Sequence, residues 1–556
     1  MKTLIIGGVA GGASAAARLR RLNENDEIII FERGDYVSFA NCGLPYFIGG
    51  DITDRNMLTL QTPESFRKRF NIEVRVRNEA VRISPDTHTI IVRRVDSGME
   101  YTETYDKLIL SPGAEPIRPD IKGIDSPNVF TLRNIPDTMK IKSYTDSAKP
   151  KKAVVVGGGY IGVEMAENLA KAGLEVSIVE LAEHLIAPLD ADIAADVHRY
   201  IRNRGIKLYL GNGVTEISDK KVILQNGTIE TDMVIMSVGV RPETSLAKEC
   251  GITLNSRGSI IVNSHMQTSS PDIYAVGDAV EVKDYITGSP AFIPLAGPAN
   301  KQGRIAADNI AGIPSEYNGS QGSAVLKLFD MTVATTGLNE KRASAEGIDY
   351  DKTYTYSASH ASYYPDATNM SVKVLWDKKT HKLIGAQIVG FDGVDKRMDV
   401  FATAIRFGAK VTDLKELELC YAPPFGSAKD PVNMVGFVAE NVINGTVKQF
   451  FWHDVEKLPR DGSVTLLDVR TKTEISRGMI DGFINIPLDT LRDNLNILPK
   501  DKPVYVHCHS GLRSYIACRI LTGNGYECYN LAGGWRLYES VIKDRTVPEY
   551  ICTECK

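Results

Sequence analysis

The chain of 556 residues is long enough for about three or four domains of ordinary size. Its composition, 43% hydrophobic and 24% charged, is that of a globular protein, and no apolar run is long enough to span a bilayer. The formal net charge is -4 with both signs interspersed, which leaves no basic stripe for a phosphate backbone. We therefore expect a soluble protein with neither nucleic acid nor a membrane as partner.

The first residues could pass for a secretory signal, because Lys2 precedes an apolar stretch and small residues. However, the glycines fall at turn spacing, and a helical pattern continues to Leu22 before a strand-like segment at 27–32. We assign this segment to the fold. Eight cysteines are too few for a disulfide scaffold, and several lie in motifs that need a free thiol, so a cytoplasmic location is expected.

One pattern occurs twice, at residues 3–32 and 152–180: an apolar strand, a glycine turn, a helix, and a second strand ending in an acid. Repeated units of this kind build doubly wound parallel sheets and predict two nucleotide sites. Residues 322–445 then show strands followed by helices, which predicts an α+β domain. A linker follows, and a βα pattern begins again at Val464. The expected fold class is α/β.

The second copy carries G-x-G-x-x-G at Gly157, Gly159 and Gly162, directly after a strand and before a helix. In this context the glycines allow a tight turn, the approach of a pyrophosphate and close packing of helix on strand. Glu180 ends the next strand, where a carboxylate accepts hydrogen bonds from ribose hydroxyls and repels a 2′-phosphate. NADH is thus favoured over NADPH. A glycine turn in an unrelated βα unit is the alternative.

The first copy matches the G-x-G-x-x-G motif less well, because Gly7 and Gly12 stand at its first and last glycines but Val9 stands at the middle one. Glu32 at the strand end supports it, as does the later segment in which Gly277 lets backbone approach a ligand and Asp278 offers an acceptor for ribityl hydroxyls. A strand ending in a polar turn is the alternative for that segment.

In this order, the motifs resemble those of the FAD- and nicotinamide-dependent disulfide reductase family over roughly residues 1–445. The resemblance implies FAD in the first site and NADH in the second, with a helix at 297–307 pointing at the flavin. The residues it implies for FAD are Gly7, Ala10, Gly11, Gly12, Glu32, Arg33, Ser111, Gly113, Gly277, Asp278 and Ala296, and those for NADH are Gly157, Gly159, Ile161, Gly162, Glu180 and Gly239.

Typical members of that family carry two redox cysteines separated by four residues, but here only Cys42 is present and Phe47 takes the second place. A lone thiol can form a mixed disulfide or persulfide, or cycle through sulfenic acid. Cys42 follows a strand end near a possible helix start, a position expected to lower the thiol pKa. A buried inert cysteine is the alternative.

The phrase Ser38-Phe-Ala-Asn-Cys-Gly-Leu-Pro-Tyr46 resembles that of coenzyme A disulfide reductases. This implies coenzyme A, as substrate or bound cofactor, linked to or lying beside Cys42. The surrounding residues would be Ser14, Arg18, Arg21, Ser38, Asn41 and Lys429. Arg18 and Arg21 are three apart on one helix face and could meet phosphates of the nucleotide end, and a solvated basic face is the alternative.

Two segments of the α+β domain, 360–365 and 419–425, resemble the family's tyrosine motifs, with Tyr363 and Tyr421 as the best matches. The resemblance implies that these hydroxyls reach the thiol site of the opposite subunit, which requires a homodimer. There a phenol could hydrogen-bond a thiolate or donate a proton to a leaving sulfur. Two core tyrosines are the alternative, and Tyr364 competes with Tyr363.

Near the C-terminus, Cys508 ends a strand in a short loop closed by Arg513 and followed by a helix. Backbone N–H groups and a guanidinium around the sulfur would stabilise a thiolate or a persulfide. The loop resembles that of rhodaneses, as do segments 467–470, 478–487 and 533–535, although Met479 and Phe483 depart from that family's pattern. A cysteine phosphatase would need one more residue between Cys and Arg, and an inactive rhodanese-like binding module is a further alternative.

No metal site is expected, because the C-x-x-C of Cys552 and Cys555 lacks a second ligand pair; a resolving or accidental pair is favoured. The expected domains are FAD-binding (1–118 and 245–321), NADH-binding (119–244), dimerisation (322–445), a linker (446–462), rhodanese (463–545) and a tail (546–556).

These features predict an enzyme that uses NADH and FAD to reduce sulfur–sulfur bonds of small molecules at Cys42. Cys508 would deliver sulfane sulfur, and hydrogen sulfide would leave. Two other enzymatic readings remain open: coenzyme A disulfide reduction for thiol homeostasis, and NADH oxidase or peroxidase activity through a sulfenate at Cys42. In a non-enzymatic reading, the last domain is a sulfur carrier or docking unit.

Overall fold

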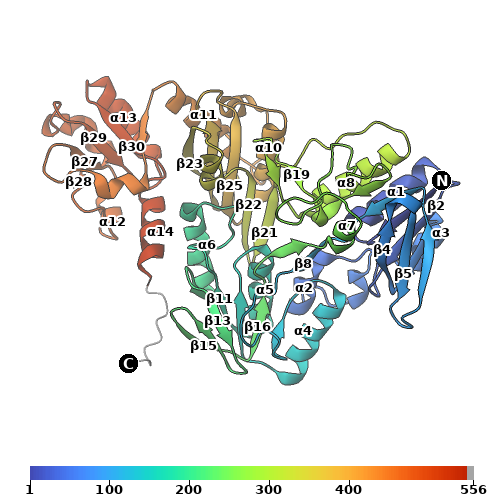
Figure 1. Ribbon diagram of the computed structural model, residues 1–556. Coiled ribbons are helices and arrows are strands. Elements are labelled where there is room, and N and C mark those ends of the chain that lie inside the picture. The colour runs from blue at the N-terminus through green and yellow to red at the C-terminus, as the bar shows by residue number, and fades with distance from the viewer. Residues whose placement is uncertain (548–556) are drawn as a thin grey trace. The chain divides into compact units, whose positions relative to one another are not determined.

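The computed structural model describes residues 1–547, which divide into two compact units (Figure 1). The first unit comprises Met1–Ala182 and Ile206–Gly322. The second comprises Glu183–Gly205 and the described chain from Ser323 onward. Cys552 and Cys555 lie outside the described residues.

The first unit contains two parallel sheets, as the duplicated pattern predicts. One has the strand order β18-β7-β1-β2-β3 and the other β12-β11-β10-β16-β9. Their strands are β1 (Lys2–Ile6), β2 (Glu27–Glu32), β3 (Glu73–Val76), β7 (Lys107–Leu110), β18 (Ile273–Ala275), and β9 (Val129–Phe130), β10 (Lys152–Val156), β11 (Glu175–Val179), β12 (Lys207–Tyr209), β16 (Met233–Met236).

Helices and small antiparallel sheets cover these parallel sheets because their strands are apolar on both faces. In the first sheet, Ile5 packs with Leu19 of α1 and Ile305 of α8 in one core cluster, while Leu4 packs with Ile90 of β5 in another. The covering elements of the unit are α1 (Ala10–Leu22), α2 (Leu44–Gly49), α3 (Pro63–Phe70), β4 (Asn78–Ser84), β5 (Thr89–Arg94), β6 (Glu100–Thr104), β8 (Ala114–Pro116), α4 (Ile135–Ala148), α5 (Tyr160–Lys171), β13 (Val214–Ile217), β14 (Lys221–Leu224), β15 (Gly227–Glu230), β17 (Val240–Pro242), α7 (Ser245–Glu249), β19 (Val282–Lys283), β20 (Pro290–Ala291) and α8 (Ala296–Ile310).

The second unit holds an antiparallel sheet, β21-β22-β25-β24-β23, and a parallel sheet, β26-β30-β29-β27-β28. The α+β and βα patterns predicted for this part of the chain are therefore present. Its elements are α6 (Ala191–Asn203), β21 (Ala324–Leu328), β22 (Met331–Gly337), α9 (Glu340–Ala345), β23 (Tyr350–Ala358), β24 (Asn369–Asp377), β25 (Leu383–Gly390), α10 (Val394–Arg406), α11 (Pro431–Ile443), β26 (Lys448–Phe450), β27 (Thr465–Asp468), α12 (Lys472–Ile475), β28 (Ile484–Asn485), β29 (Val504–His507), α13 (Leu512–Gly523), β30 (Cys528–Leu531) and α14 (Gly534–Thr546).

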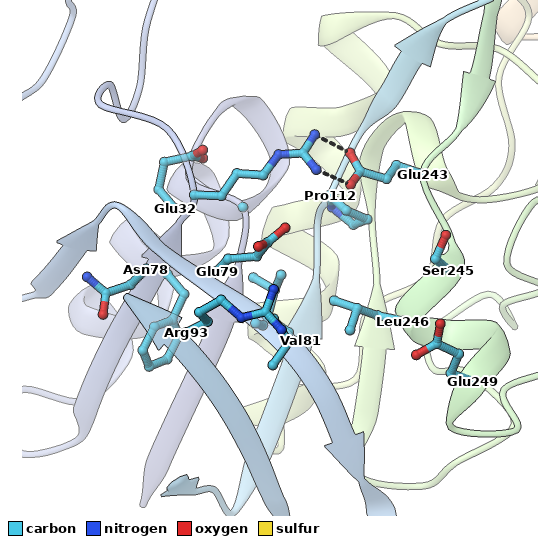
Figure 2. A pocket seen from close by; sticks show the side chains of 15 residues that line it. Glu32, Asn78, Glu79, Val81, Arg93, Pro112, Glu243, Ser245, Leu246 and Glu249 are labelled. Atoms are coloured by element: carbon cyan, nitrogen blue, oxygen red, sulfur yellow. Dashed lines mark hydrogen bonds and ion pairs between the residues drawn. The ribbon is translucent and has the colours of Figure 1, made fainter. Parts of the chain in front are cut away.

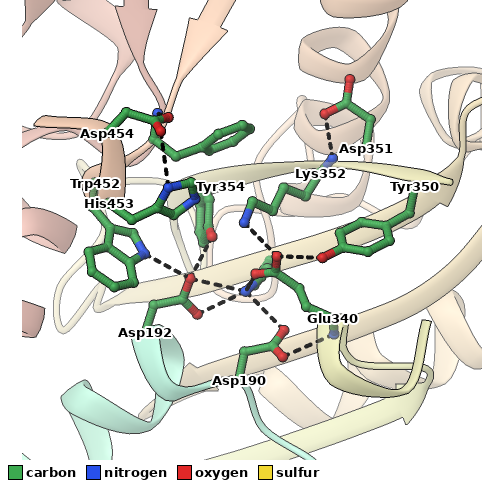
Figure 3. Close-up of polar contacts among 12 residues, drawn as sticks. Asp190, Asp192, Glu340, Tyr350, Asp351, Lys352, Tyr354, Trp452, His453 and Asp454 are labelled. Atoms are coloured by element: carbon green, nitrogen blue, oxygen red, sulfur yellow. Dashed lines mark hydrogen bonds and ion pairs between the residues drawn. The ribbon is translucent and has the colours of Figure 1, made fainter. Parts of the chain in front are cut away.

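A buried lysine joins several elements of the second unit (Figure 3). Lys373 of β24 lies 2.9 Å from a carboxylate oxygen of Asp190 and 2.9 Å from one of Asp192, and it also pairs with Glu340 of α9. The indole of Trp452, in the segment that enters the parallel sheet's domain, donates to Asp192 at 3.2 Å. The ammonium thus compensates three carboxylates that would otherwise repel one another.

The last helix, α14, packs on α6 through a second polar contact. Leu185 donates its backbone N–H to His198 Nε2 at 3.1 Å, so Nδ1 carries the proton and donates to Asp544 of α14 at 2.8 Å. One turn earlier, Ser540 donates to Asp196 at 2.7 Å. The C-terminal domain is therefore held to α6 within this unit.

Within residues 1–547, no helix combines the length and apolar character that crossing a membrane requires.

Replacing Lys373 by Met should lower the free energy of unfolding of the second unit by about 3–5 kcal/mol, because it leaves buried carboxylates without their counter-charge. The three tryptophans, Trp376, Trp452 and Trp535, all lie in this unit, so their fluorescence during urea denaturation reports on it alone. The matched control, Lys378→Met, breaks an exposed pair with Asp349 and should cost less than about 1 kcal/mol. Equal losses in both variants would contradict the role assigned to Lys373.

Candidate functional site

The first glycine turn lies between β1 and α1 and has room only for glycine at two positions. Gly7 has φ +94°, and a Cβ there would lie 2.1 Å from the carbonyl oxygen of Ser111. A Cβ at Gly12 would lie 2.0 Å from the carbonyl oxygen of Gly7. Val9, at the expected middle glycine, is the N-cap of α1, and Ser111 Oγ accepts from the Gly12 N–H at 3.1 Å. The turn thus keeps its close packing without the middle glycine.

A cavity of about 420 Å³ opens beside this turn (Figure 2). Its wall includes Gly7, Glu32 and Arg33, three of the residues predicted for FAD. Glu32 accepts from the backbone of Gly34 at 2.9 Å and of Gly8 at 3.3 Å, and Arg33 pairs with Glu243 at 2.5 Å. A cavity of this size, with a carboxylate beside the N-terminus of a helix, fits the nucleotide half of FAD.

Other residues predicted for FAD lie around the same sheet. Gly277 has φ +82° and donates its N–H to Gln302 of α8 at 2.7 Å. Burial raises the pKa of the neighbouring Asp278 carboxyl. Gly113 has φ +78°, where a Cβ would collide with the Arg133 guanidinium at 2.4 Å. Ala296 is the first residue of α8, and Ala10 and Gly11 are the first two residues of α1.

The second glycine turn, between β10 and α5, repeats this geometry. Gly157 has φ +105°, and a Cβ at Gly162 would lie 1.9 Å from the Gly157 carbonyl oxygen. A Cβ at Gly159 would meet no atom within 4 Å, so the backbone there is open to an incoming group. Glu180 accepts from Gly158 at 2.6 Å and from Ala182 at 2.8 Å. The predicted NADH residues Ile161 (41% exposed) and Gly239 (φ +110°) complete this set.

Cys42 lies in the single turn η1 (Asn41–Gly43), directly before α2, and is exposed. Its surroundings raise the thiol pKa, first by burial of the sulfur's neighbourhood and then through the negative charges of Glu164 and Asp278. The expectation that the pKa of the Cys42 thiol is lowered is therefore wrong: the protein groups around the sulfur raise it. The short α2 does not outweigh desolvation and two carboxylates.

Tyr46 and Glu164 were missed by the sequence analysis. Tyr46 Oη donates to Glu164 of α5 at 3.2 Å. Burial raises the pKa of Glu164 to about 7, so this carboxyl titrates near neutral pH beside the thiol. The sequence does not single out Glu164, because the same helix, α5, also has the polar residues Glu167 and Asn168 on its buried face.

Some of the residues predicted to bind coenzyme A in the first unit already have hydrogen-bond partners within the protein. Ser14 donates to Asn300 at 2.7 Å and Arg18 to Asp308 at 2.6 Å, both on α8, whereas Arg21 is exposed. Ser38 has φ +47° and binds the Gly8 carbonyl through its N–H at 2.8 Å. The buried Oδ1 of Asn41 has no partner among the described residues, and an unpaired acceptor beside Cys42 suits a ligand with a donor.

In the second unit, Tyr363 and Tyr421 share a hydrogen bond of 2.9 Å between their hydroxyls. Tyr363 is 74% exposed and Tyr421 is also exposed, so neither is a core residue. The competing Tyr364 packs edge-on against His360 with ring centroids 5.7 Å apart. Lys429 is exposed next to Asp430, which pairs with Arg397 at 2.9 Å. The structure therefore brings the two predicted tyrosines together on a surface.

Cys508 is buried at the end of β29 within a cradle of donors. Its sulfur accepts from the Gly511 N–H at 3.1 Å and from Ser514 Oγ at 3.2 Å. Gly511, with φ +103°, is the N-cap of α13, so the helix begins at the sulfur. Donors in this arrangement stabilise negative charge on sulfur.

Arg513 closes the loop in an ion pair that the sequence did not reveal. Its two terminal nitrogens donate to Glu474 of α12 at 2.8 and 2.5 Å. The Arg513 hydrogen bond is the first cause that lowers the pKa of Glu474 to about 2, so the pair stays ionised at all pH values near neutrality. Glu474 also forms a capping box with Thr471, which was the available signal in sequence.

The turn before α14 supports the same loop from behind. Trp535 and Arg536 donate their backbone N–H groups to the carbonyls of Cys508 and His509 at 2.8 and 2.9 Å. A Cβ at Gly534 would lie 2.7 Å from the Cys508 carbonyl oxygen, which explains the Gly-Gly-Trp motif. Asp468 and Arg470, from another predicted motif, form a fully buried pair at 2.7 Å below the ring of Trp535.

Comparisons with known proteins agree with this geometry. Residues 1–303 match the pyridine nucleotide-disulphide oxidoreductase family, 323–431 its dimerisation domain and 452–540 a rhodanese-like domain. The chain belongs to the pyridine nucleotide-disulphide oxidoreductase family and is a flavoenzyme of that class with a C-terminal rhodanese domain. The expected class, fold and use of FAD with a nicotinamide nucleotide are thereby confirmed.

Two solved structures and one curated relative are similar to this chain over most of its length. The crystal structure of reduced CoADR-RHD from Bacillus anthracis has a TM-score of 0.96 and 51% identity, covering 98% of each chain. A NAD-dependent persulfide reductase from A. fulgidus has a TM-score of 0.91 and 35% identity, covering 97% of this chain and 100% of that one. A coenzyme A disulfide reductase of Staphylococcus epidermidis is 36% identical over 441 residues, 79% of this chain and 100% of that protein.

Replacing Ser514 by Ala should slow sulfur transfer at Cys508 about fivefold, because it removes one of the two donors to the sulfur, a loss of about 1 kcal/mol. The rate of transfer from thiosulfate to cyanide, and of alkylation of Cys508 by iodoacetamide, would fall together. Ser476→Ala is the control, because that exposed hydroxyl of the same domain bonds only the Thr473 carbonyl. An unchanged alkylation rate in Ser514→Ala would refute this role.

Proposed function

We propose that this enzyme reduces coenzyme A persulfide and related sulfane-sulfur compounds with NADH at Cys42, while Cys508 supplies the sulfane sulfur. The observation that carries the proposal is the presence of two free cysteines in two separate motifs, one in each unit. Cys42 is an exposed lone thiol in the flavin-binding unit, and Cys508 lies in a cradle of donors in a rhodanese domain. The names of the persulfide reductase and the coenzyme A disulfide reductase support the substrate class.

At Cys42, the thiolate attacks the inner sulfur of the persulfide, so a mixed disulfide with coenzyme A forms and hydrosulfide leaves. Cleavage of this disulfide takes up the two electrons of NADH, which FAD would transmit when it is bound. Coenzyme A thiol is then released and the Cys42 thiolate returns. The net reaction converts NADH, one proton and coenzyme A persulfide into NAD⁺, coenzyme A and hydrogen sulfide, which balances atoms and electrons. Tyr46 and Glu164 lie beside this sulfur as groups that can hold a proton.

We also propose that the protein is a homodimer in which Tyr363 and Tyr421 reach Cys42 of the opposite subunit. Their paired hydroxyls are exposed and therefore accessible to a second subunit. Burial and the carboxylates of Glu164 and Asp278 raise the pKa of the Cys42 thiol. Hydrogen bonds from the phenols to the sulfur would lower this pKa again. The six described cysteines are free thiols, which fits a reducing cytoplasm.

At Cys508, the sulfane sulfur of a donor would be transferred to the cradled sulfur as a persulfide and then to coenzyme A. Gly511 and Ser514 hold negative charge at that sulfur during both transfers. Coenzyme A would then carry the sulfur as the substrate of Cys42. The predicted contacts with coenzyme A are Ser14, Arg18, Arg21, Ser38, Asn41 and Lys429.

Substitution of the two cysteines tests the proposal. Cys42→Ser should abolish NADH oxidation with coenzyme A persulfide, polysulfide and coenzyme A disulfide, while flavin absorbance is retained. Cys508→Ser should keep the reaction with coenzyme A persulfide but slow the coupled reaction of polysulfide with coenzyme A, and Cys250→Ser serves as the control. If Cys508→Ser leaves every substrate unaffected, the coupling is wrong. If peroxide is reduced fastest, the peroxidase reading replaces this one.

Glu180 should set the choice between NADH and NADPH. Glu180→Ala removes the carboxylate beside Gly158 and should lower kcat/KM for NADH about 10- to 100-fold, the worth of a charged hydrogen bond. The value for NADPH should not fall by the same factor, since the carboxylate no longer repels a 2′-phosphate. Glu183→Ala, at an exposed position nearby, is the control. Parallel losses for both nucleotides would show that Glu180 only supports the turn.

A further inference from the structure

The loop that holds Cys508 contains a single permanent cation, and that cation is already paired. From Cys508 to Arg513 the sequence is Cys-His-Ser-Gly-Leu-Arg, so Arg513 is the only lysine or arginine in the loop. Its two terminal nitrogens donate to the two carboxylate oxygens of Glu474 at 2.8 and 2.5 Å. The side chains are 33% and 29% exposed, so the pair lies at the surface of the loop. As a whole, this bidentate pair has no net charge.

Two further arginines act electrostatically on His509 of the loop, and each has its own partner. The guanidinium of Arg536 lies 4.4 Å from the centre of the Tyr356 ring. Arg470 is buried and pairs with Asp468 at 2.7 Å. His509 itself adds little positive charge near neutral pH, because partial burial lowers the pKa of its imidazole. These groups offer an incoming anion no uncompensated positive charge.

Apolar side chains are exposed beside the same loop. Leu512 is 59% exposed and follows Gly511, whose N–H binds the Cys508 sulfur. Met479 is 45% exposed, and a Cβ at the glycine before it would lie 3.0 Å from the ring of Trp535. Met479 is also one of the two positions at which the sequence departs from the rhodanese pattern. Leucine and methionine side chains can pack against a carbon chain but donate no hydrogen bond to an oxyanion.

We propose that Cys508 takes its sulfur from organic persulfides, R–S–SH, in preference to thiosulfate. This inference rests on the sulfur transfer proposed for Cys508 and names its donor. The Cys508 thiolate attacks the outer sulfur of R–S–SH, so a new S–S bond forms at Cys508 and the S–S bond of the donor breaks. The thiolate RS⁻ leaves with the electron pair of the broken bond. The proton stays on the transferred sulfur, and the reaction has no net oxidation or reduction.

The preference follows from charge at the loop. Thiosulfate carries two negative charges, with a sulfonate attached to the sulfur that is transferred. Its approach to Cys508 brings the sulfonate to the loop whose one arginine is already neutralised by Glu474. Like charges brought together oppose binding. The carbon chain of an organic persulfide needs no such charge and can pack on exposed apolar side chains such as Leu512.

The test uses the full-length protein with Cys42→Ser, so that the flavin-linked thiol does not compete. The reduced protein is mixed with 2-hydroxyethyl persulfide or with sodium thiosulfate and quenched with iodoacetamide. Mass spectrometry of the peptide that contains Cys508 then follows the gain of one sulfur atom. Each rate constant is divided by that of the same donor with free mercaptoethanol, which corrects for the donors' intrinsic reactivity. We expect the corrected value for the persulfide to exceed that for thiosulfate at least about tenfold, because like charges oppose the second reaction.

Two variants test whether charge is the cause. Glu474→Gln keeps the shape of the side chain but removes the charge that neutralises Arg513. The ratio of the thiosulfate rate to the persulfide rate should then rise about fivefold, and high salt should reduce this rise. Met479→Lys adds a cation at an exposed position and should raise the same ratio without altering the ion pair. The control, Glu539→Gln, breaks a surface pair on α14 and should leave the ratio unchanged.

The outcomes separate this inference from the function on which it rests. If the corrected rates of the two donors are equal, or if neither Glu474→Gln nor Met479→Lys changes their ratio, charge does not select the donor and the proposal fails. Sulfur would still reach Cys508 in that case, so the proposed function would stand. If neither donor adds sulfur to Cys508, sulfur delivery by the rhodanese domain is refuted and this inference falls with it.

Discussion

The ammonium of Lys373 is the contact on which the organisation of the second unit depends. Asp190, Asp192 and Glu340 come from the α6 region and from α9, and together they resemble a set of metal ligands. The lysine lies among all three, so the negative charge is satisfied by the chain itself. Because Trp452 hydrogen-bonds to the same Asp192, the linker to the rhodanese domain is fixed to the antiparallel sheet through one desolvated charge cluster.

The two proposed sulfur sites are built on opposite electrostatic principles. Cys42 lies near the carboxyls of Glu164 and Asp278, which oppose ionisation of the thiol. Cys508 lies against an N–H, a hydroxyl and the start of a helix, all of which favour negative sulfur. In the homodimer proposed above, the exposed tyrosine pair of the opposite subunit would supply hydrogen bonds to a thiolate at Cys42.

The parts of the fold and of the nucleotide sites that could be predicted from the sequence are those where a position has no room for a side chain. Gly7, Gly12, Gly157 and Gly162 collide with backbone if a side chain is added, so these glycines, together with the repeated pattern of strand, turn, helix and strand, predicted both parallel sheets. Contacts between distant segments carried no such signal. Glu474 pairs with Arg513 across 39 residues. The pKa of the Cys42 thiol is raised first by burial and then by the charge of Glu164, which lies more than a hundred residues away in the chain. Long-range charge depends on packing, which local patterns do not encode.

The way α14 is held has a consequence for engineering the rhodanese domain. The backbone of its first turn supports the carbonyls of Cys508 and His509, while its last turns bind His198 and Asp196 of α6. One helix thus connects the sulfur loop to a segment that precedes the domain by more than two hundred residues. The rhodanese domain expressed on its own would lack the contacts of α14 with α6. A fusion of this domain to another protein would therefore have to include a helix that replaces α6.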